Sequence, residues 1–73
     1  MRKVFHKIES LAGNVMTLKA PGVSYGELAQ VTSPMGTSLA QVIKLDGDRV
    51  SLQVFAGARG ISTDAQVRFL GHG

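Results

Sequence analysis

Apolar and polar side chains alternate along most of this chain of 73 residues, and no segment carries a sustained apolar face at helical spacing. Alternation suits a half-buried strand, because successive side chains of a strand point to opposite faces of a sheet. In residues 49–55, for example, three aliphatic residues share one face, and Ser51, Gln53 and Phe55 share the other. We therefore expect an all-β domain with six short strands, at residues 4–11, 15–19, 27–32, 38–45, 49–55 and 66–70.

Turn residues separate these expected strands at intervals of about 8 to 12 residues, which is typical of a small sandwich or barrel. Gly13 closes a hairpin between the first two strands, and Asp46-Gly47, set between two alternating runs, is the strongest hairpin signal in the chain. A domain this small cannot leave long sheet edges open without inviting aggregation. The expected architecture is therefore a small closed six-stranded antiparallel β-barrel.

The length of the chain limits it to a single domain, residues 1–73, with a thin stability margin. A domain of this size buries only about 60% of the surface that its unfolded chain exposes. The chain has no cysteine, so neither a disulfide nor a thiolate zinc site is available. Its apolar stretches are shorter than the roughly 20 residues of a membrane span, and its N-terminus lacks the apolar region of a signal peptide. We expect a cytoplasmic location.

The net charge of +3 is basic, but the cations are spread along the chain and interleaved with acidic residues. Only Arg2 and Lys3 are adjacent. A nucleic-acid-binding surface usually gathers its cations in a stripe and adds aromatic side chains on which bases stack, whereas this chain has one tyrosine and three phenylalanines. An independent small barrel that binds single-stranded nucleic acid therefore remains the alternative interpretation, and salt-dependent binding to single strands would favour it.

No arrangement of residues predicts catalysis. His6 and His72 lie far apart in sequence, and Asp46 and Asp48 flank a turn glycine, where aspartate is favoured for backbone reasons. The serines and threonines do not fall in a nucleophile-elbow pattern. The run 57–60 lacks the Gly-Lys-Ser/Thr ending of a phosphate-binding loop. We expect no enzymatic activity of this chain alone, no catalytic residue, no cofactor and no metal site.

The loop at residues 56–61 allows two interpretations. Gly57 and Gly60 allow its backbone to turn sharply or to approach another surface closely, and Arg59 between them carries a planar fork of donors that fits a carboxylate. The loop is then either a tight surface turn with a solvated arginine or a contact with a partner.

The chain resembles the N-terminal β-barrel domain of the B subunit, the non-catalytic subunit, of the vacuolar/archaeal-type rotary ATPase (ATP synthase). The resemblance covers nearly the whole chain, and its most specific part is the ending Val-Arg-Phe-Leu-Gly after a Gly-Ile loop. Ala40, Ala56 and Ala58 depart from the residues that the family usually has there, so interface chemistry is not carried over to them. The residues that carry the resemblance are 23–28, 41–42, 53–55, Gly57, 60–61 and 67–71.

The resemblance implies an assembly role. In the family, barrels of A and B subunits alternate side by side in a ring that holds the hexameric head together, and the B barrel docks the peripheral stalk. Nucleotide binding and rotor contacts belong to later domains, so the chain is expected to be the crown domain cut from a longer subunit. The implied partners are A subunits and stalk subunits, with no nucleic acid and no direct membrane contact. The implied location is the soluble, cytoplasmic head of the complex, peripheral to the membrane, where the complex couples ATP to proton or sodium transport. The expected interface residues are Gly57, Arg59, Gly60, Tyr25 and Glu27.

Overall fold

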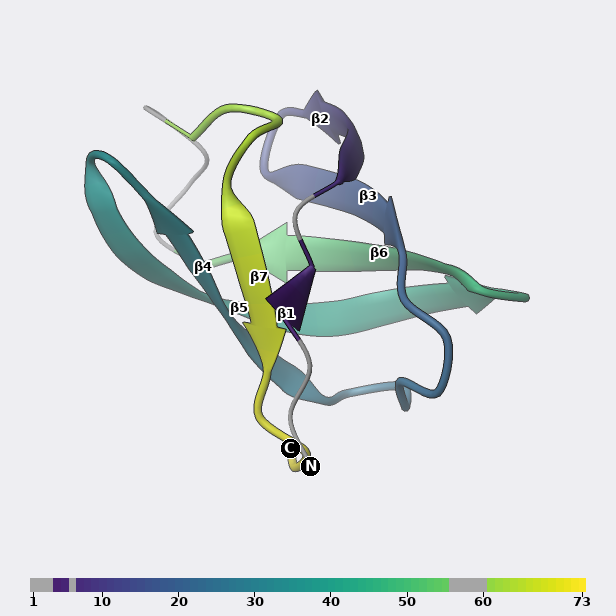
Figure 1. Cartoon of the computed structure of the whole chain (residues 1–73). Helices are drawn as coiled ribbons and strands as arrows, with labels where there is room; N and C mark the ends of the chain where they lie inside the picture. The colour runs from purple at the N-terminus through teal and green to yellow at the C-terminus, as the bar shows by residue number, and fades with distance from the viewer. Residues whose placement is uncertain (1–3, 6, 56–60) are drawn as a thin grey trace.

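The described part of the chain is all-β and forms one antiparallel sheet. The computed structural model describes residues 4–5, 7–55 and 61–73. The strands follow the order β1-β7-β4-β5-β6-β3-β2 across the sheet (Figure 1). They are β1 (Val4–Phe5), β2 (Ile8–Ala12), β3 (Val15–Lys19), β4 (Leu28–Ser33), β5 (Gly36–Asp46), β6 (Arg49–Val54) and β7 (Gln66–Phe69).

The described residues form seven strands where the sequence predicts six, because the first expected strand divides. Val4 and Phe5 pair with β7, whereas Ile8 pairs with Leu18 of β3. The two halves of the run thus join opposite ends of the sheet, although only residues 6 and 7 separate them. Alternation of polarity continues through such a crossing, so the sequence pattern does not show where one strand ends and the next begins. The strand at residues 15–19 is confirmed, and the other four agree with the structure to within two residues at each end.

The division of this run also shows how strongly the sheet is curved. Seven strands in a flat sheet would separate the end strands by about 29 Å. The three peptide units from Phe5 to Ile8 can span at most about 11 Å. The sheet must therefore curl into an antiparallel half-barrel, and β1 and β7 cross steeply over β5 and β6 in Figure 1. The pairings of the described residues leave β1 and β2 as end strands, so closure of the ladder stays a prediction.

Both hairpins predicted from glycine are present, but the second one uses different residues. Ala12 pairs with Val15 and Asp46 pairs with Arg49, so the turns are Gly13-Asn14 and Gly47-Asp48. Gly13 and Gly47 each have a φ of 61°, and the residue after each has negative φ. A glycine with positive φ at the first of the two central turn positions is typical of a type II′ turn. The Asp46-Gly47 pair expected to form the turn is therefore shifted by one residue.

Strand β5 links the two halves of the sheet. Its first half pairs with β4 and its second half with β6, and the register shifts between Val42 and Lys44. An extra residue in one strand bends that strand and increases its twist. This irregularity lies where β5 passes from one partner to the other and helps the sheet to curl.

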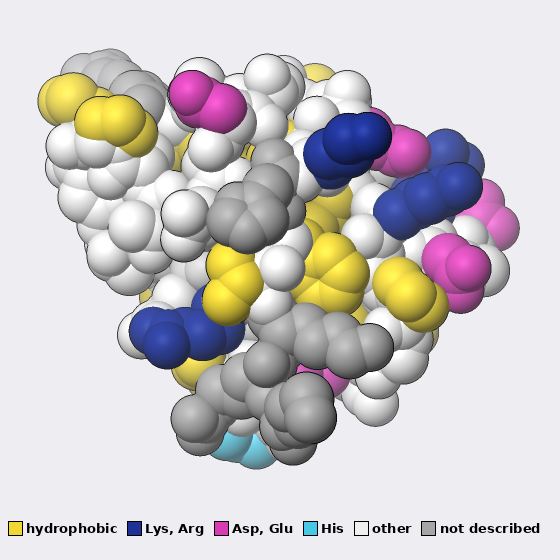
Figure 2. All heavy atoms as spheres, viewed as in Figure 1, with side chains coloured by type: hydrophobic (Ala, Val, Ile, Leu, Met, Phe, Trp, Pro, Cys, Tyr) yellow, Lys and Arg dark blue, Asp and Glu magenta, His cyan; other side chains and the backbone are white. Residues whose placement is uncertain are grey.

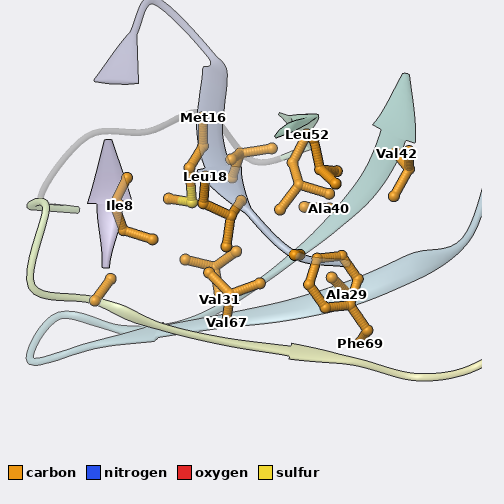
Figure 3. Packing of buried hydrophobic residues seen from close by; sticks show 14 residues of the cluster. Ile8, Met16, Leu18, Ala29, Val31, Ala40, Val42, Leu52, Val67 and Phe69 are labelled. Carbon is orange, nitrogen blue, oxygen red and sulfur yellow. The ribbon is translucent and has the colours of Figure 1, made fainter. Parts of the chain in front are cut away.

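The concave side of the sheet holds a core of small and branched apolar side chains (Figure 3). Phe69 in this core meets the partly buried Phe5 edge to face, with ring centroids 5.6 Å apart. Among the described residues, no buried polar side chain interrupts this core. Its members are Ile8, Met16, Leu18, Ala20, Ala29, Val31, Ala40, Val42, Val50, Leu52, Val54, Ala65, Val67 and Phe69.

Candidate functional site

An uncharged apolar patch lies on the convex side of the sheet, where β5 meets the end of β6. Ala40 and Val54 pair across the two strands and are buried, so their neighbours Leu39 and Phe55 point outward together. The backbone N–H of Phe55 donates to the carbonyl of Leu39 at 2.9 Å, and the two side chains are 42% and 54% exposed. We call these two residues the Leu39–Phe55 patch.

Amide side chains lie beside the patch in the strand ladders of the described residues. Gln30 of β4 pairs with Leu39, and Gln41 and Gln53 pair with one another two residues from Leu39 and Phe55. The nearest cation in these ladders is Arg68, whose guanidinium donates to Gln30 Oε1 at 2.7 Å. Cores of protein interfaces are depleted in charge and enriched in aromatic residues, so the chemistry of the patch fits a protein contact.

Leu39 is not among the interface residues expected from the sequence. A signal for the patch exists in the sequence, because Phe55 falls on the same strand face as Ser51 and Gln53, where a polar residue is expected. A large apolar residue on a polar face is unremarkable when it stands alone. Its pairing with Leu39 depends on the register between β5 and β6, and only the tertiary structure supplies that register.

Tyr25, one of the expected interface residues, projects from the connection between β3 and β4 and is 72% exposed. The backbone beside it is tied to β5. Gly26, with a φ of 82°, donates its N–H to the carbonyl of Val42 at 3.0 Å, and Val42 returns its own N–H to the carbonyl of Glu27 at 2.9 Å. The side-chain amide of Gln41 adds a 3.0 Å bond to the carbonyl of Gly26. Tyr25 is thus an exposed ring on a well-anchored loop.

Glu27 uses both of its carboxylate oxygens within the chain. Oε1 accepts the backbone N–H of Ser24 at 3.1 Å, and Oε2 accepts the backbone N–H of Gly71 at 2.8 Å. Glu27 is expected from the sequence only as an interface residue, and no pattern along the chain indicates the contact with Gly71. A place for Glu27 at a partner contact stays a prediction, and so does that of Tyr25.

The other three expected interface residues, Gly57, Arg59 and Gly60, lie outside the described residues. The loop that contains them begins directly after Phe55, so the Leu39–Phe55 patch adjoins this loop in the chain. Their interface role stays a prediction.

A shallow open hollow of about 380 Å³ lies on the side of the domain where β1 leads to β2. Its lining combines apolar side chains with Lys7, Lys19 and Glu9. Glu9 is engaged by Arg49 of β6, through an Nε to Oε1 bond of 2.7 Å and a second bond of 3.3 Å to Oε2. Cationic and acidic side chains alternate over this region rather than forming one stripe (Figure 2). The lining residues are Val4, Phe5, Lys7, Glu9 and Lys19.

The ion pair between Arg49 and Glu9 shifts both titrations. The side-chain hydrogen bond from Arg49 is the main cause that lowers the pKa of the Glu9 carboxyl; burial opposes it, and the charges of Arg49 and Lys19 lower the pKa further by smaller amounts. The same hydrogen bond raises the pKa of Arg49. A carboxyl whose pKa is lowered by folding contributes stability above its unfolded pKa, and this contribution is lost as the pH falls through the folded value.

Glu9→Gln is therefore expected to make the stability of the domain less sensitive to acid. The unmodified chain should lose the contribution of the ion pair as the pH falls below 4.5, the ordinary value for this carboxyl, and the variant should lose less over the same interval. The effect should be small, because exposed ion pairs contribute little. Urea unfolding between pH 3 and 7 measures it, with Asp48→Asn as the control at another exposed carboxylate. Parallel pH profiles for the unmodified chain and Glu9→Gln would contradict the expectation.

Over residues 4–5, 7–55 and 61–73, histidine and acidic side chains do not gather in groups of three or more. The same ranges contain no helix with the length and hydrophobicity that a membrane crossing requires.

A family model described as the ATP synthase alpha/beta family, beta-barrel domain, matches residues 8–71. The chain belongs to this family. The match takes in every strand but β1, together with the Leu39–Phe55 patch, Tyr25 and Glu27.

Relatives named V-type ATP synthase beta chain are similar to this β-barrel domain over almost all of its length, which confirms the resemblance seen in the sequence. The protein from Treponema denticola is 66% identical over 71 residues, which are 97% of the chain. The beta chain 1 of Treponema pallidum is 64% identical over 73 residues, and the protein from Protochlamydia amoebophila is 48% identical over 71 residues, or 100% and 96% of the chain. The chain spans only 16% to 17% of the length of these relatives.

Proposed function

We propose that this chain is the N-terminal barrel domain of the B subunit of a V/A-type rotary ATPase and that it serves assembly rather than catalysis. The observation that carries the proposal is the match of the whole chain, at 64% identity, to a protein named V-type ATP synthase beta chain. In this role the domain, with its sheet closed into a barrel, packs beside neighbouring A- and B-subunit barrels in the ring of the head and docks the peripheral stalk. Its location is the cytoplasmic head of the complex, peripheral to the membrane.

In this proposal, ATP binding and the coupling to proton or sodium transport belong to other parts of the complex. The domain supplies protein contacts, and the Leu39–Phe55 patch supports that role because it is exposed, apolar and uncharged. The loop that follows Phe55 contains Gly57, Arg59 and Gly60, so the patch and this loop together form the proposed contact surface. Tyr25 and Glu27 belong to a second part of that surface.

Phe55→Ser and Arg59→Ala are each expected to weaken assembly with A subunits and stalk subunits by several-fold to tenfold while leaving the fold intact. A tenfold change corresponds to about 1.4 kcal/mol, which is in the range of the minority of interface side chains whose truncation costs more than about 1 kcal/mol. Reconstitution of the head from purified subunits, followed by native mass spectrometry or sedimentation, measures the effect.

Leu45→Ser provides the matched control for this experiment. Leu45 is 40% exposed, close to the 42% of Leu39, but it lies six residues further along β5, which is about 20 Å along the strand. Thermal unfolding of each variant confirms that the fold persists. Unchanged assembly of both Phe55→Ser and Arg59→Ala would overturn the proposed contact surface. Salt-dependent binding of the domain to single-stranded nucleic acid would instead favour the alternative function.

A further inference from the structure

The segment that follows β7 lies against the connection that leads into β4. Leu70 donates its N–H to the carbonyl of Leu28 at 2.9 Å, and Leu28 donates its own N–H to the carbonyl of His72 at 2.8 Å. A Cβ built on Gly73 would lie 3.3 Å from the carbonyl oxygen of Gly26. Residues 70–73 therefore continue alongside residues 26–28 after the regular ladder between β4 and β7 has ended.

Gly71, between the two residues that bond to Leu28, has a left-handed backbone conformation with a φ of 83°. Its N–H then meets the Oε2 atom of Glu27 at 2.8 Å. A side-chain carboxylate thus acts as the acceptor for this donor where the backbone ladder offers none. The other oxygen of the same carboxylate holds the N–H of Ser24. Carboxylates that accept backbone N–H groups form bonds stronger than those between neutral groups.

We propose that Glu27 is a positioning residue that fixes the direction in which the chain leaves the barrel after β7. Its carboxylate joins the loop at Ser24 to the turn at Gly71, and the loop is joined in turn to β5 through Gly26 and Val42. The exit segment, the loop that presents Tyr25 and the middle of the sheet thereby form one rigid unit.

The consequence concerns the orientation of whatever follows the barrel, and it rests on the proposed function, in which a longer subunit continues beyond Gly73. A partner that contacts Tyr25 and a domain that follows the exit segment are then held at a fixed relative geometry. Loss of the carboxylate leaves the barrel folded and the backbone bond from Leu28 to His72 in place, but it frees the turn at Gly71 from the loop at Ser24.

Hydrogen exchange of the full-length subunit tests this proposal without any partner present. In Glu27→Ala, the amides of Ser24 and Gly71 should exchange at least tenfold faster, whereas those of Val31 and Val67 in the core should not change. Glu27→Gln keeps one carbonyl acceptor, so one of the two amides should stay protected. Glu9→Ala, which removes an exposed glutamate bound to a side chain instead, serves as the control and should leave both amides unchanged.

Unchanged exchange at Gly71 in Glu27→Ala would overturn the proposal. If Glu27→Ala unfolds the domain and raises exchange at all amides, Glu27→Gln provides the test instead. Equal protection of the Ser24 and Gly71 amides in Glu27→Gln would then also overturn the proposal. The proposed assembly function fails on a different measurement, which is reconstitution of the head. Unchanged assembly of Phe55→Ser and Arg59→Ala, together with faster exchange at Gly71 in Glu27→Ala, would overturn only the assembly surface. Weakened assembly of those two variants, together with unchanged exchange at Gly71 in Glu27→Ala, would overturn only the positioning role of Glu27.

Discussion

Leu52→Ala is expected to lower the free energy of unfolding by about 2 to 5 kcal/mol, the usual range for such a truncation in a packed core. Leu52 is fully buried in the middle of β6, where it pairs with Met16 of β3 on one side and Val42 of β5 on the other. Removal of its isobutyl group leaves a void between three strands. Marginal domains are stable by only about 5 to 15 kcal/mol, so this single change removes a large fraction of the total.

Urea denaturation of the variant measures the loss as a lower midpoint at an unchanged slope. Gln53→Ala is the matched control, because Gln53 is the next residue of the same strand and its side chain is exposed on the opposite face. That control should change the free energy of unfolding by no more than about 0.5 kcal/mol. A loss below about 1 kcal/mol for Leu52→Ala would mean that the curled sheet does not pack around β6 as described.

Ala40→Leu is expected to destabilise the domain by about 1 to 3 kcal/mol, although it adds apolar surface to an apolar core. Register places four inward residues in one row across the sheet, in the order Phe69, Ala29, Ala40 and Val54. Both alanines are fully buried, and Figure 3 shows the Phe69 ring lying next to Ala29. Phe5 meets that ring edge to face, so the ring cannot move aside without losing this contact.

A double-mutant cycle tests this explanation. Phe69→Leu alone should destabilise the domain, but in the Ala40→Leu background it should recover part of the loss, because the smaller side chain returns volume to the row. Lys44→Leu, an exposed position on the same strand, controls for the change to leucine itself and should be close to neutral. Additive effects of Ala40→Leu and Phe69→Leu would show that the two positions do not compete for space.

Part of the fold is predictable from local features of the sequence. The alternation of apolar and polar side chains indicates the strands, and glycine marks the two hairpins. Most strand bounds therefore follow from residues close in sequence. The exact turn does not follow as well, because Asp46-Gly47 and Gly47-Asp48 are both acceptable turn pairs and the register of β5 against β6 chooses between them. The sequence predicts Tyr25 as an interface residue only through the family resemblance.

Two features of the candidate site depend on contacts between residues far apart in the chain. Glu27 accepts a hydrogen bond from Gly71, 44 residues away, and Leu39 meets Phe55 across two strands. Neither pairing has a local signature, because a glutamate after a glycine and a leucine within an alternating run are both ordinary. The division of the first strand has the same origin, since its halves differ only in the partners that they find at opposite ends of the sheet.

The sequence by itself determined the all-β class and most of the strand positions, because these depend on the order of polarity and on turn residues along the chain. The family followed from the resemblance of particular residues, above all the Val-Arg-Phe-Leu-Gly ending. Only the tertiary structure decided the strand count, the curl of the sheet, the Leu39–Phe55 patch and the attachment of the exit segment by Glu27. The physical reason is that a strand makes no ladder hydrogen bonds within itself, so it must pair with neighbouring strands and bury one face against the rest of the domain. Which strand it finds, and in which register, is settled by how the whole sheet buries its small core.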